Sequence, residues 1–447
     1  MPTSRTDGLA RTQGLARADG SARTHGFARA QRRVRTRRSV RTRRPVLAAL
    51  CALAALAAAQ FTTAPSAAAL DNGQARTPAM GWNSWNAFRC DIDEQKIRAA
   101  ADALVGTGLR EAGYRYVNID DCWQAPTRDA EGRLRADPAR FPGGIAALAD
   151  YVHDKGLKLG LYATPGRRTC ANIWHDYPGS LGSLGHEYQD AETFAGWGVD
   201  YLKYDWCYAG KDGVRAEPGF TTMRDALAAT GRPMLFSIHH EPQLPVWDWR
   251  PQVANSWRVA ADIRDNWQSM IGIVRINQPL AAHAGPGAWN DPDMLEVGNG
   301  GMTDAEYRTH FGLWAQMAAP LLISTDLTAA TPRTLRLLAN RDVIAVDQDP
   351  LGRQGTVVSR EDGLVVMTKP LVGGARSVTL TNETDATATV STTTAAAGLK
   401  RHDSYAVKNL WTGRESFTAG TLRAEVPAHD TVMYRVAPDP TGAAADR

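Results

Sequence analysis

The sequence offers few of the spacings that hold metal ions or phosphates. Five of its 447 residues are cysteine, no CxxC pair occurs, and no clustered His/Cys spacing is present, so a structural zinc site is not expected. No glycine-rich phosphate loop is found, and the one GxSxG-like stretch, Gly179-Ser180-Leu181-Gly182, does not match a nucleophile elbow. The sequence therefore gives little support to phosphate-cradling or serine-nucleophile chemistry.

The chain also lacks an excess of positive charge once the N-terminal residues are set aside. Residues 1–44 carry thirteen Arg and two Asp, a net +11, whereas the whole chain carries only +4. The remainder is therefore net −7, and the sequence does not predict a nucleic-acid partner.

No apolar run is long enough to cross a membrane. After Arg43-Arg44, an apolar segment over residues 45–59 is followed by Ala67-Ala68-Ala69, which is the charged, apolar and small-residue order of a signal peptide. We expect residues 1–69 to be a cleaved export signal with a basic low-complexity leader, and the mature protein to be secreted and free of the membrane. Residues 42–47 resemble a twin-arginine signal, and general secretion fits nearly as well.

The cysteines outside this signal are even in number. Cys51 lies within the signal, and the exported chain keeps Cys90, Cys122, Cys170 and Cys207. Two disulfides are expected in an oxidising compartment, and four cysteines allow three pairings.

Short apolar runs alternate with helix-like segments over residues 70–345. Strands are predicted at 78–85, 114–121, 157–164, 199–206, 233–240, 255–262, 288–295 and 320–327, and helical periods recur at 94–106, 145–155 and 222–230. Eight strands interleaved with helices predict an α/β fold, a (β/α)8 TIM barrel.

The composition and the pattern of apolar residues change over residues 346–437. Short runs rich in Thr and Val occur at 356–359, 364–368, 377–381, 386–393, 404–409 and 432–436. They predict a C-terminal antiparallel β-sandwich with few candidate catalytic groups. Residues 438–447 are expected to be a disordered tail.

Two ionisable residues interrupt the apolar strand at 199–206. Lys203 and Asp205 lie two apart and so point to the same side of the strand. Charges in an apolar strand are costly unless they are paired or used. They could form a buried structural ion pair, or Asp205 could stand at the C-terminal end of a barrel strand, where such enzymes keep their chemistry.

Polar groups also follow the ends of other predicted strands. Asp120-Asp121 suits sugar hydroxyls, or alternatively a helix cap and a calcium ligand, and Trp85 is either a core residue or a face on which a pyranose stacks. Arg258 and Asp262 lie on one side of a strand, where Arg258 could simply neutralise Asp262. A purely structural barrel has no reason to place carboxylates along one rim.

Two carboxylates on different strands, with a Lys and an Arg to separate their pKa values, suit glycoside hydrolysis. One must stay ionised and attack the anomeric carbon, and the other must hold a proton for the leaving oxygen. Because Lys203 beside Asp205 favours the ionised form, we assign Asp205 as the nucleophile and Asp262 as the acid/base.

Several ordered motifs carry a family resemblance. They are Met80-Gly81-Trp82-Asn83-Ser84-Trp85, Asn118-Ile119-Asp120-Asp121-Cys122-Trp123, Gly156-Leu157-Lys158-Leu159-Gly160-Leu161-Tyr162, Leu202-Lys203-Tyr204-Asp205, Asn255-Ser256-Trp257-Arg258, Trp289-Asn290-Asp291-Pro292-Asp293-Met294 and Asp347-Gln348-Asp349-Pro350. Over residues 74–435 the chain resembles the retaining α-galactosidases (melibiases) of glycoside hydrolase family 27.

The resemblance implies a barrel followed by a β-sandwich and a reaction that needs neither a metal nor an organic cofactor. It gives Asp205 and Asp262 the same roles as above, and it implies disulfides Cys90–Cys122 and Cys170–Cys207. The positions that hold the terminal sugar in the family correspond to Trp85, Asp120, Asp121, Tyr162, Lys203 and Arg258. The expected substrate is an oligosaccharide or polysaccharide with a terminal galacto-configured sugar.

Two departures from the family bear on the sugar. Where the family usually reads Leu-Cys-Glu-Trp, with the Glu near the 2-hydroxyl, this chain reads Ile238-His239-His240-Glu241. Ungapped alignment places His240 at that position, and Glu241 could still reach from a loop, so both are candidate substrate-binding residues; a one-residue slip on a strand would reverse their facing. The family also often has an Asp where this chain has Thr164.

Two alternatives remain at this stage. The same fold and mechanism could act on a β-L-arabinopyranoside, an α-N-acetylgalactosaminide or an isomaltosyl unit. A non-catalytic carbohydrate-binding protein is a further alternative, which predicts loss of a catalytic carboxylate, whereas Asp205 and Asp262 are both present.

Overall fold

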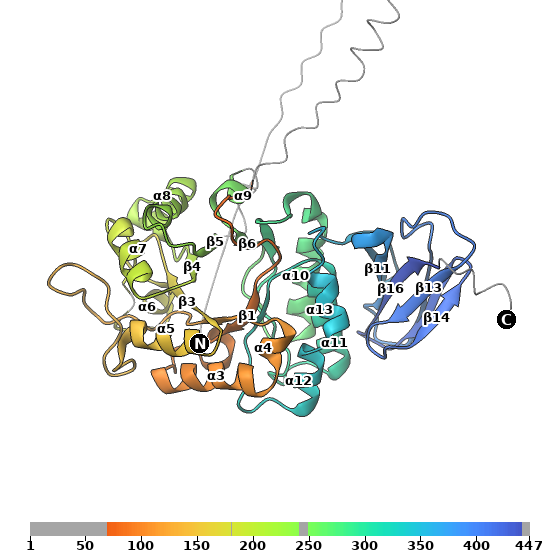
Figure 1. The fold of residues 1–447 in the computed structure, drawn as a ribbon, viewed down its shortest axis with the longest axis horizontal. Helices are drawn as coiled ribbons and strands as arrows, with labels where there is room; N and C mark the ends of the chain where they lie inside the picture. Colours follow the sequence, from red (N-terminus) through yellow and green to blue (C-terminus); the bar gives the residue numbers. More distant parts are fainter. Residues whose placement is uncertain (1–68, 180, 241–248, 440–447) are drawn as a thin grey trace, which may run out of the picture. The chain divides into compact units, whose positions relative to one another are not determined.

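Eight parallel strands form the sheet that carries the first domain (Figure 1). The computed structural model describes residues 69–179, 181–240 and 249–439. The strands run in the spatial order β7-β6-β5-β4-β3-β2-β1-β8, and Leu295, which follows β7, makes a parallel bridge to Ile323 of β8 that joins the two ends. The predicted α/β barrel is thereby confirmed, and all eight predicted strand segments contain one of its strands: β1 Met80–Asn83, β2 Tyr116–Asn118, β3 Lys158–Ala163, β4 Tyr201–Asp205, β5 Leu235–His239, β6 Ser256–Arg258, β7 Trp289–Asp291 and β8 Leu321–Ile323.

Helices connect these strands, and several of them, such as α3 and α5, bury one apolar face. In α3 the Asp93 side chain accepts from the Lys96 amide, which caps the first turn, and an apolar stripe including Ile97 and Leu104 is buried. The helix occupies the predicted range, whereas α8 begins six residues earlier than predicted because its first turns carry polar and small residues. The helices are α2 Trp85–Phe88, α3 Glu94–Gly106, α4 Leu109–Ala112, α5 Gly144–Asp154, α6 Cys170–Trp174, α7 Glu187–Gly196, α8 Ala216–Ala229, α9 Arg250–Val253, α10 Trp267–Asn277, α11 Asp304–Gln316, α12 Pro332–Leu338 and α13 Arg341–Asp347.

The barrel interior changes from apolar to polar along the strands. Near the strand N-termini, Tyr116, Tyr201, Leu235 and Leu322 form one buried cluster. Further along, polar side chains of the same strands line a small cavity: Asn83, Lys203, Ser237, Arg258 and Asp291. The apolar layer closes the bottom of the barrel, so chemistry is confined to the C-terminal ends of the strands.

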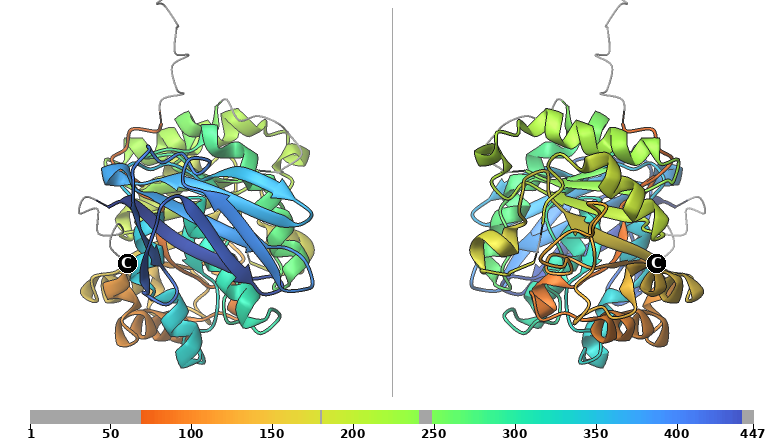
Figure 2. Two further views of the ribbon diagram at one scale, coloured as in Figure 1. Left: turned by 90° about the vertical axis from the view of Figure 1, so that its right-hand side faces the viewer. Right: turned by 90° about the vertical axis from the view of Figure 1, so that its left-hand side faces the viewer.

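The second domain is a β-sandwich, seen face-on in the left view of Figure 2. Its six-stranded antiparallel sheet has the order β14-β13-β16-β11-β10-β9, and β12 and β15 form a second sheet. The strands are β9 Thr356–Glu361, β10 Leu364–Pro370, β11 Arg376–Asn382, β12 Ala388–Thr393, β13 Tyr405–Asn409, β14 Glu415–Thr418, β15 Thr421–Val426 and β16 Thr431–Pro438. The predicted sandwich is confirmed, but the prediction missed β14 and β15, which carry few apolar residues: β14 is an exposed edge strand, and β15 buries only Leu422 and Val426.

The predicted export signal and most of the predicted tail lie outside the described residues. At the C-terminus, β16 continues to Pro438, and the Asp439 amide donates to the Ser404 carbonyl. Within the described ranges, no helix combines the length and apolarity needed to span a bilayer.

Candidate active site

A cleft of about 170 Å³ opens at the C-terminal ends of the barrel strands. It lies where the sequence placed the rim carboxylates, and it brings together side chains from β3, β4 and β6 and from the loops that follow β1 and β2. Eight of the ten predicted catalytic and sugar-binding residues line it: Trp85, Asp120, Asp121, Tyr162, Lys203, Asp205, Arg258 and Asp262.

Asp205 ends β4 and sits deep in the cleft, 9% exposed. Its Oδ1 accepts from the Trp206 amide at 2.8 Å and lies 3.2 Å from His239 Nδ1, and its Oδ2 accepts from the Tyr162 hydroxyl at 3.2 Å. Burial alone would raise the pKa of Asp205, but His239 and, less strongly, Lys203 outweigh it and hold the pKa below its ordinary value. The carboxylate is therefore oriented and kept ionised, as a nucleophile requires.

Lys203 binds a different carboxylate from the one expected. Its Nζ donates to Asp120 Oδ2 at 2.7 Å, and Asn83 Nδ2 donates to the same oxygen at 2.8 Å. Burial opposes the charged form of Lys203, yet Asp120 and then Asp205 outweigh it and raise its pKa. The structural alternative of a direct Lys203–Asp205 ion pair is thus replaced by a Lys203–Asp120 pair, and Lys203 acts on Asp205 only through space.

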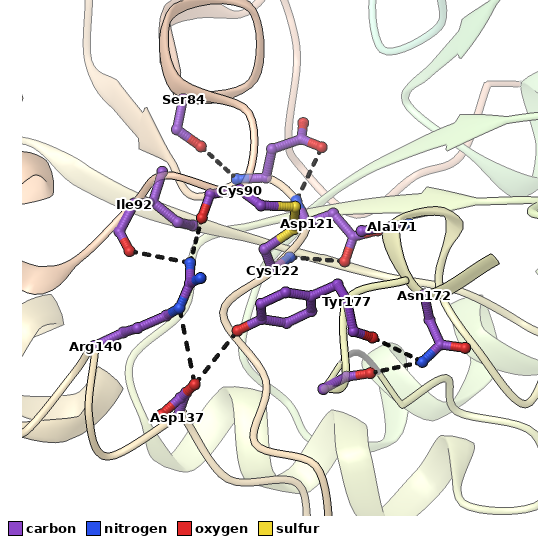
Figure 3. The surroundings of a disulfide bond; sticks show 12 residues. Ser84, Cys90, Ile92, Asp121, Cys122, Asp137, Arg140, Ala171, Asn172 and Tyr177 are labelled. Carbon is purple, nitrogen blue, oxygen red and sulfur yellow. Dashed lines mark hydrogen bonds and ion pairs between the residues drawn. A yellow bond between two sulfur atoms is a disulfide. The ribbon is translucent and has the colours of Figure 1, made fainter. Parts of the chain in front are cut away.

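Asp121 fastens the loops around the cleft (Figure 3). Its two carboxylate oxygens accept from the Cys122 and Ala171 amides, both at 2.7 Å. Burial raises the pKa of Asp121 to about 6. The disulfide Cys90–Cys122 lies beside it, and the structure also joins Cys170 to Cys207, which is the pairing that the family resemblance implied.

Arg258 holds the opposite side of the cleft. Buried at the end of β6, it donates from Nη2 to Asp293 Oδ2 at 2.7 Å and to Asp262 Oδ1 at 3.1 Å. The Asp262 side chain is 68% exposed. Burial against the rim opposes its ionisation, but the Arg258 guanidinium outweighs this and holds the pKa of Asp262 below its ordinary value. The two candidate catalytic carboxylates therefore differ in environment, one enclosed and one open to solvent.

The histidine of β5 that lines the cleft is His239, not the next residue, His240. Along β5 the side chains of Leu235, Ser237 and His239 face the barrel interior, and His239 is paired in register with Asp205. His240 faces the other way and packs on the Trp206 ring with centroids 4.9 Å apart. His240 therefore does not line the cleft, whereas His239 does, because side chains alternate along a strand. Glu241 lies outside the described residues.

Several cleft residues were not assigned a role from the sequence, and three of them matter for the site. Asp293 was named only within a family motif, although its side chain accepts from the Ile263 and Met294 amides and pairs with Arg258. His239 could have been found by extending the alternation of β5 from Ser237. Trp174 on α6 gives no periodic signal, since the helix has only five residues.

Among the described residues, the cleft contains no group of side chains that could hold a metal ion. Within the described part of the chain, the side chains close enough to share an ion are Cys170, Asp205 and Cys207, and the two sulfurs are joined in a disulfide. A disulfide sulfur carries no thiolate to coordinate a metal.

Comparison with known proteins gives consistent matches over both domains. Residues 77–349 match the family model described as Alpha galactosidase A, and residues 361–436 match that of the alpha galactosidase C-terminal beta sandwich domain. An α-galactosidase of Cyamopsis tetragonoloba is 47% identical over 373 residues, covering 82% of this chain and 88% of that protein.

Solved structures show the same architecture. α-Galactosidase I of Mortierella vinacea superimposes with a TM-score of 0.78 at 35% identity, covering 83% of this chain and 99% of that one. A family 27 β-L-arabinopyranosidase of Geobacillus stearothermophilus gives 0.75 at 25% identity, covering 83% and 98%.

Proposed function

This chain belongs to the α-galactosidase family, glycoside hydrolase family 27, and we propose that it is a secreted, retaining exo-glycosidase that releases terminal α-D-galactosyl residues. The observation that carries the proposal is the pair of unlike carboxylates in one cleft. Asp205 is enclosed and hydrogen-bonded, and Asp262 is exposed beside Arg258. Different environments of this kind assign different roles to two carboxylates.

The sugar is held by the polar side of the cleft. We assign Asp120, Lys203 and Asp121 to the axial 4-hydroxyl and the 6-hydroxyl, and Trp85 to the apolar face of the ring. The Lys203–Asp120 pair supports this assignment, because a carboxylate and an ammonium fixed against each other offer an acceptor and donors in fixed positions.

In the first step Asp205 attacks the anomeric carbon. The bond from that carbon to the leaving oxygen breaks, Asp262 gives this oxygen its proton, and a covalent glycosyl ester remains on Asp205. The Tyr162 hydroxyl, 3.2 Å from Asp205 Oδ2, fixes which way the carboxylate faces. In the second step Asp262 takes a proton from water, the water attacks the same carbon, and Asp205 leaves as a carboxylate.

Asp262 must hold a proton in the first step although Arg258 favours its ionised form. A bound sugar covers the exposed carboxylate and removes water from it, which raises its pKa. The negative charge of Asp205 acts in the same direction until it is lost in the ester. Arg258 then drives Asp262 back to its basic form, as the second step needs.

The proposal is tested by assaying the purified, secreted chain with a panel of nitrophenyl glycosides. The α-D-galactoside should be cleaved far faster than the β-L-arabinopyranoside, the α-N-acetylgalactosaminide and the α-glucoside, and proton NMR should show α-galactose as the first product. Preference for another glycoside in the panel would refute the sugar assignment, and β-galactose as the first product would refute retention. Recovery of a chain that starts near Leu70 from the medium would support export.

A further inference from the structure

Two large aromatic side chains stand exposed at the mouth of the cleft. Trp174, the last residue of α6, is 53% exposed and lines the cleft, and Tyr208, in the loop after β4, is 37% exposed. Their rings meet edge to face with centroids 5.1 Å apart. Side chains of this size are normally buried, so a braced, exposed pair beside a catalytic cleft calls for a reason.

The pair is built on two loops that are fastened to each other. Cys170 begins α6 and is bonded to Cys207, the residue before Tyr208. The Arg167 amide of the first loop donates to Asp212 of the second at 2.8 Å. The Trp174–Tyr208 pair therefore keeps its geometry without a bound ligand, and binding to it costs little ordering.

Trp174 supplies the binding face, and Tyr208 braces it. Lys211 Nζ lies 4.3 Å from the centre of the Tyr208 ring, so one face of that ring is already covered by a cation. Trp174 has no such cation among the contacts within the described residues, and it is the one of the two that lines the cleft.

The neighbours of Trp174 select the ligand chemistry. Most of the residues that line the cleft together with Trp174 are polar or charged, and they include Asn86, Arg89 and His175. An alkyl chain would need an apolar groove, which these residues do not provide. A pyranose has one apolar C–H face and a rim of hydroxyls, which matches a single indole face surrounded by hydrogen-bonding groups.

We propose that Trp174, braced by Tyr208, is the platform for the sugar unit to which the terminal galactose is attached, so that the enzyme prefers galactosyl-oligosaccharides over simple galactosides. This inference rests on the proposed function, because it names the acceptor side of the same cleft. Contacts between Trp174 and this second sugar unit would then help to stabilise the transition state.

The test compares two substrates that differ in that unit alone. Melibiose carries a glucose on the leaving side, and methyl α-D-galactopyranoside carries only a methyl group, but in both substrates the leaving group is an aliphatic alcohol that needs a proton from the acid/base. Covering roughly 50–60 Å² of indole at about 25 cal/mol per Å² corresponds to about tenfold. Trp174→Ala should therefore lower kcat/KM for melibiose about tenfold and change that for the methyl galactoside less than about twofold.

Further variants control for the substitution itself. Trp174→Phe should recover part of the loss, and Tyr208→Ala should give a smaller loss in the same direction. Tyr188→Ala removes an aromatic side chain that is also 53% exposed but lies on α7 and does not line the cleft, so it should affect neither substrate.

The outcomes separate the platform from the proposed function. Equal losses on both substrates, or none on either, with wild-type turnover of both intact would overturn the platform alone. A wild-type enzyme that cleaves neither substrate would overturn the proposed function and the platform with it.

Discussion

The imidazole of His239 provides the sharpest test of the site. Its Nδ1 lies 3.2 Å from Asp205 Oδ1, and it lowers the pKa of both Asp205 and Asp262. A hydrogen bond to a charged group contributes about 1.5–3 kcal/mol. Because 3.2 Å is long for such a bond, we take the lower end of this range for the stabilisation that His239 gives to the ionised form of Asp205.

Replacing His239 by Ala should therefore move the whole pH profile. Both apparent pKa values of the coupled carboxylates rise when the imidazole is lost, so the acidic and the alkaline limbs of kcat/KM should each shift to higher pH. Activity at the acidic end falls because Asp205 becomes protonated there. His239→Gln, which keeps a hydrogen-bond donor without a charge, should shift the profile less.

The assay is initial-rate kinetics on nitrophenyl α-D-galactoside across pH, with the thermal midpoint of each variant as a check on folding. His240→Gln is the matched control, because its ring faces Trp206 rather than the cleft and its loss should leave both limbs in place. A profile that stays fixed in His239→Ala, or moves in His240→Gln instead, would refute the assignment of the facing along β5.

Three further predictions concern single residues. Asp205→Ala should lower kcat by about 10³-fold or more while keeping the fold, and azide should restore turnover with a β-galactosyl azide as product; turnover close to wild type without azide would disprove the nucleophile. Asp262→Ala should lower kcat/KM for melibiose about 10²- to 10⁴-fold but that for nitrophenyl galactoside far less. An equal loss of kcat/KM on both substrates would show that Asp262 is not the acid/base. His310 is fully buried, with its Nε2 accepting from the Glu296 amide, and burial lowers its pKa to about 3. Since an unfolded His binds its proton near pH 6.5, the protein should lose up to about 1.4 kcal/mol of folding free energy per pH unit between pH 6.5 and 3; urea midpoints at pH 7 and 5 should show a shallower loss in His310→Gln, and an identical loss would exclude His310 as the cause.

Much of the fold follows from local patterns in the sequence. Strands such as β3, β5 and β8 are largely apolar runs between turn residues, and the helical period at residues 94–106 coincides with α3. Edge strands such as β14 were missed because exposed residues carry no periodic apolar signal. The first turn of α8 was missed for a similar reason, since residues 216–219 are not buried.

The candidate site was predictable in its residues more than in its pairings. Asp205 and Arg258 end β4 and β6, as their positions in the sequence predicted, and the cleft contains both. Asp262 also lines the cleft, but the prediction that it shares one side of a strand with Arg258 was wrong, because β6 ends at Arg258 and Asp262 lies in the loop that follows. His240 was chosen instead of His239 because the ungapped alignment to the family motif was followed and the alternation of side chains along β5 was not. Trp174 depends on how two loops meet, which no local pattern encodes.

The pairings explain how the two candidate catalytic carboxylates are stabilised as anions before substrate binds and yet remain free to react. Lys203 makes its short ion pair with Asp120, and Arg258 makes the shorter of its two ion pairs with Asp293, each at 2.7 Å. Each cation therefore stabilises its catalytic neighbour mainly by charge, across a longer or indirect contact, and does not lock it in a short ion pair that the reaction would have to break. Because Asp120 and Asp293 are remote in sequence from the cations they bind, only the closed barrel brings these pairs together, and a sequence pattern alone assigns each cation to the nearest carboxylate along its own strand.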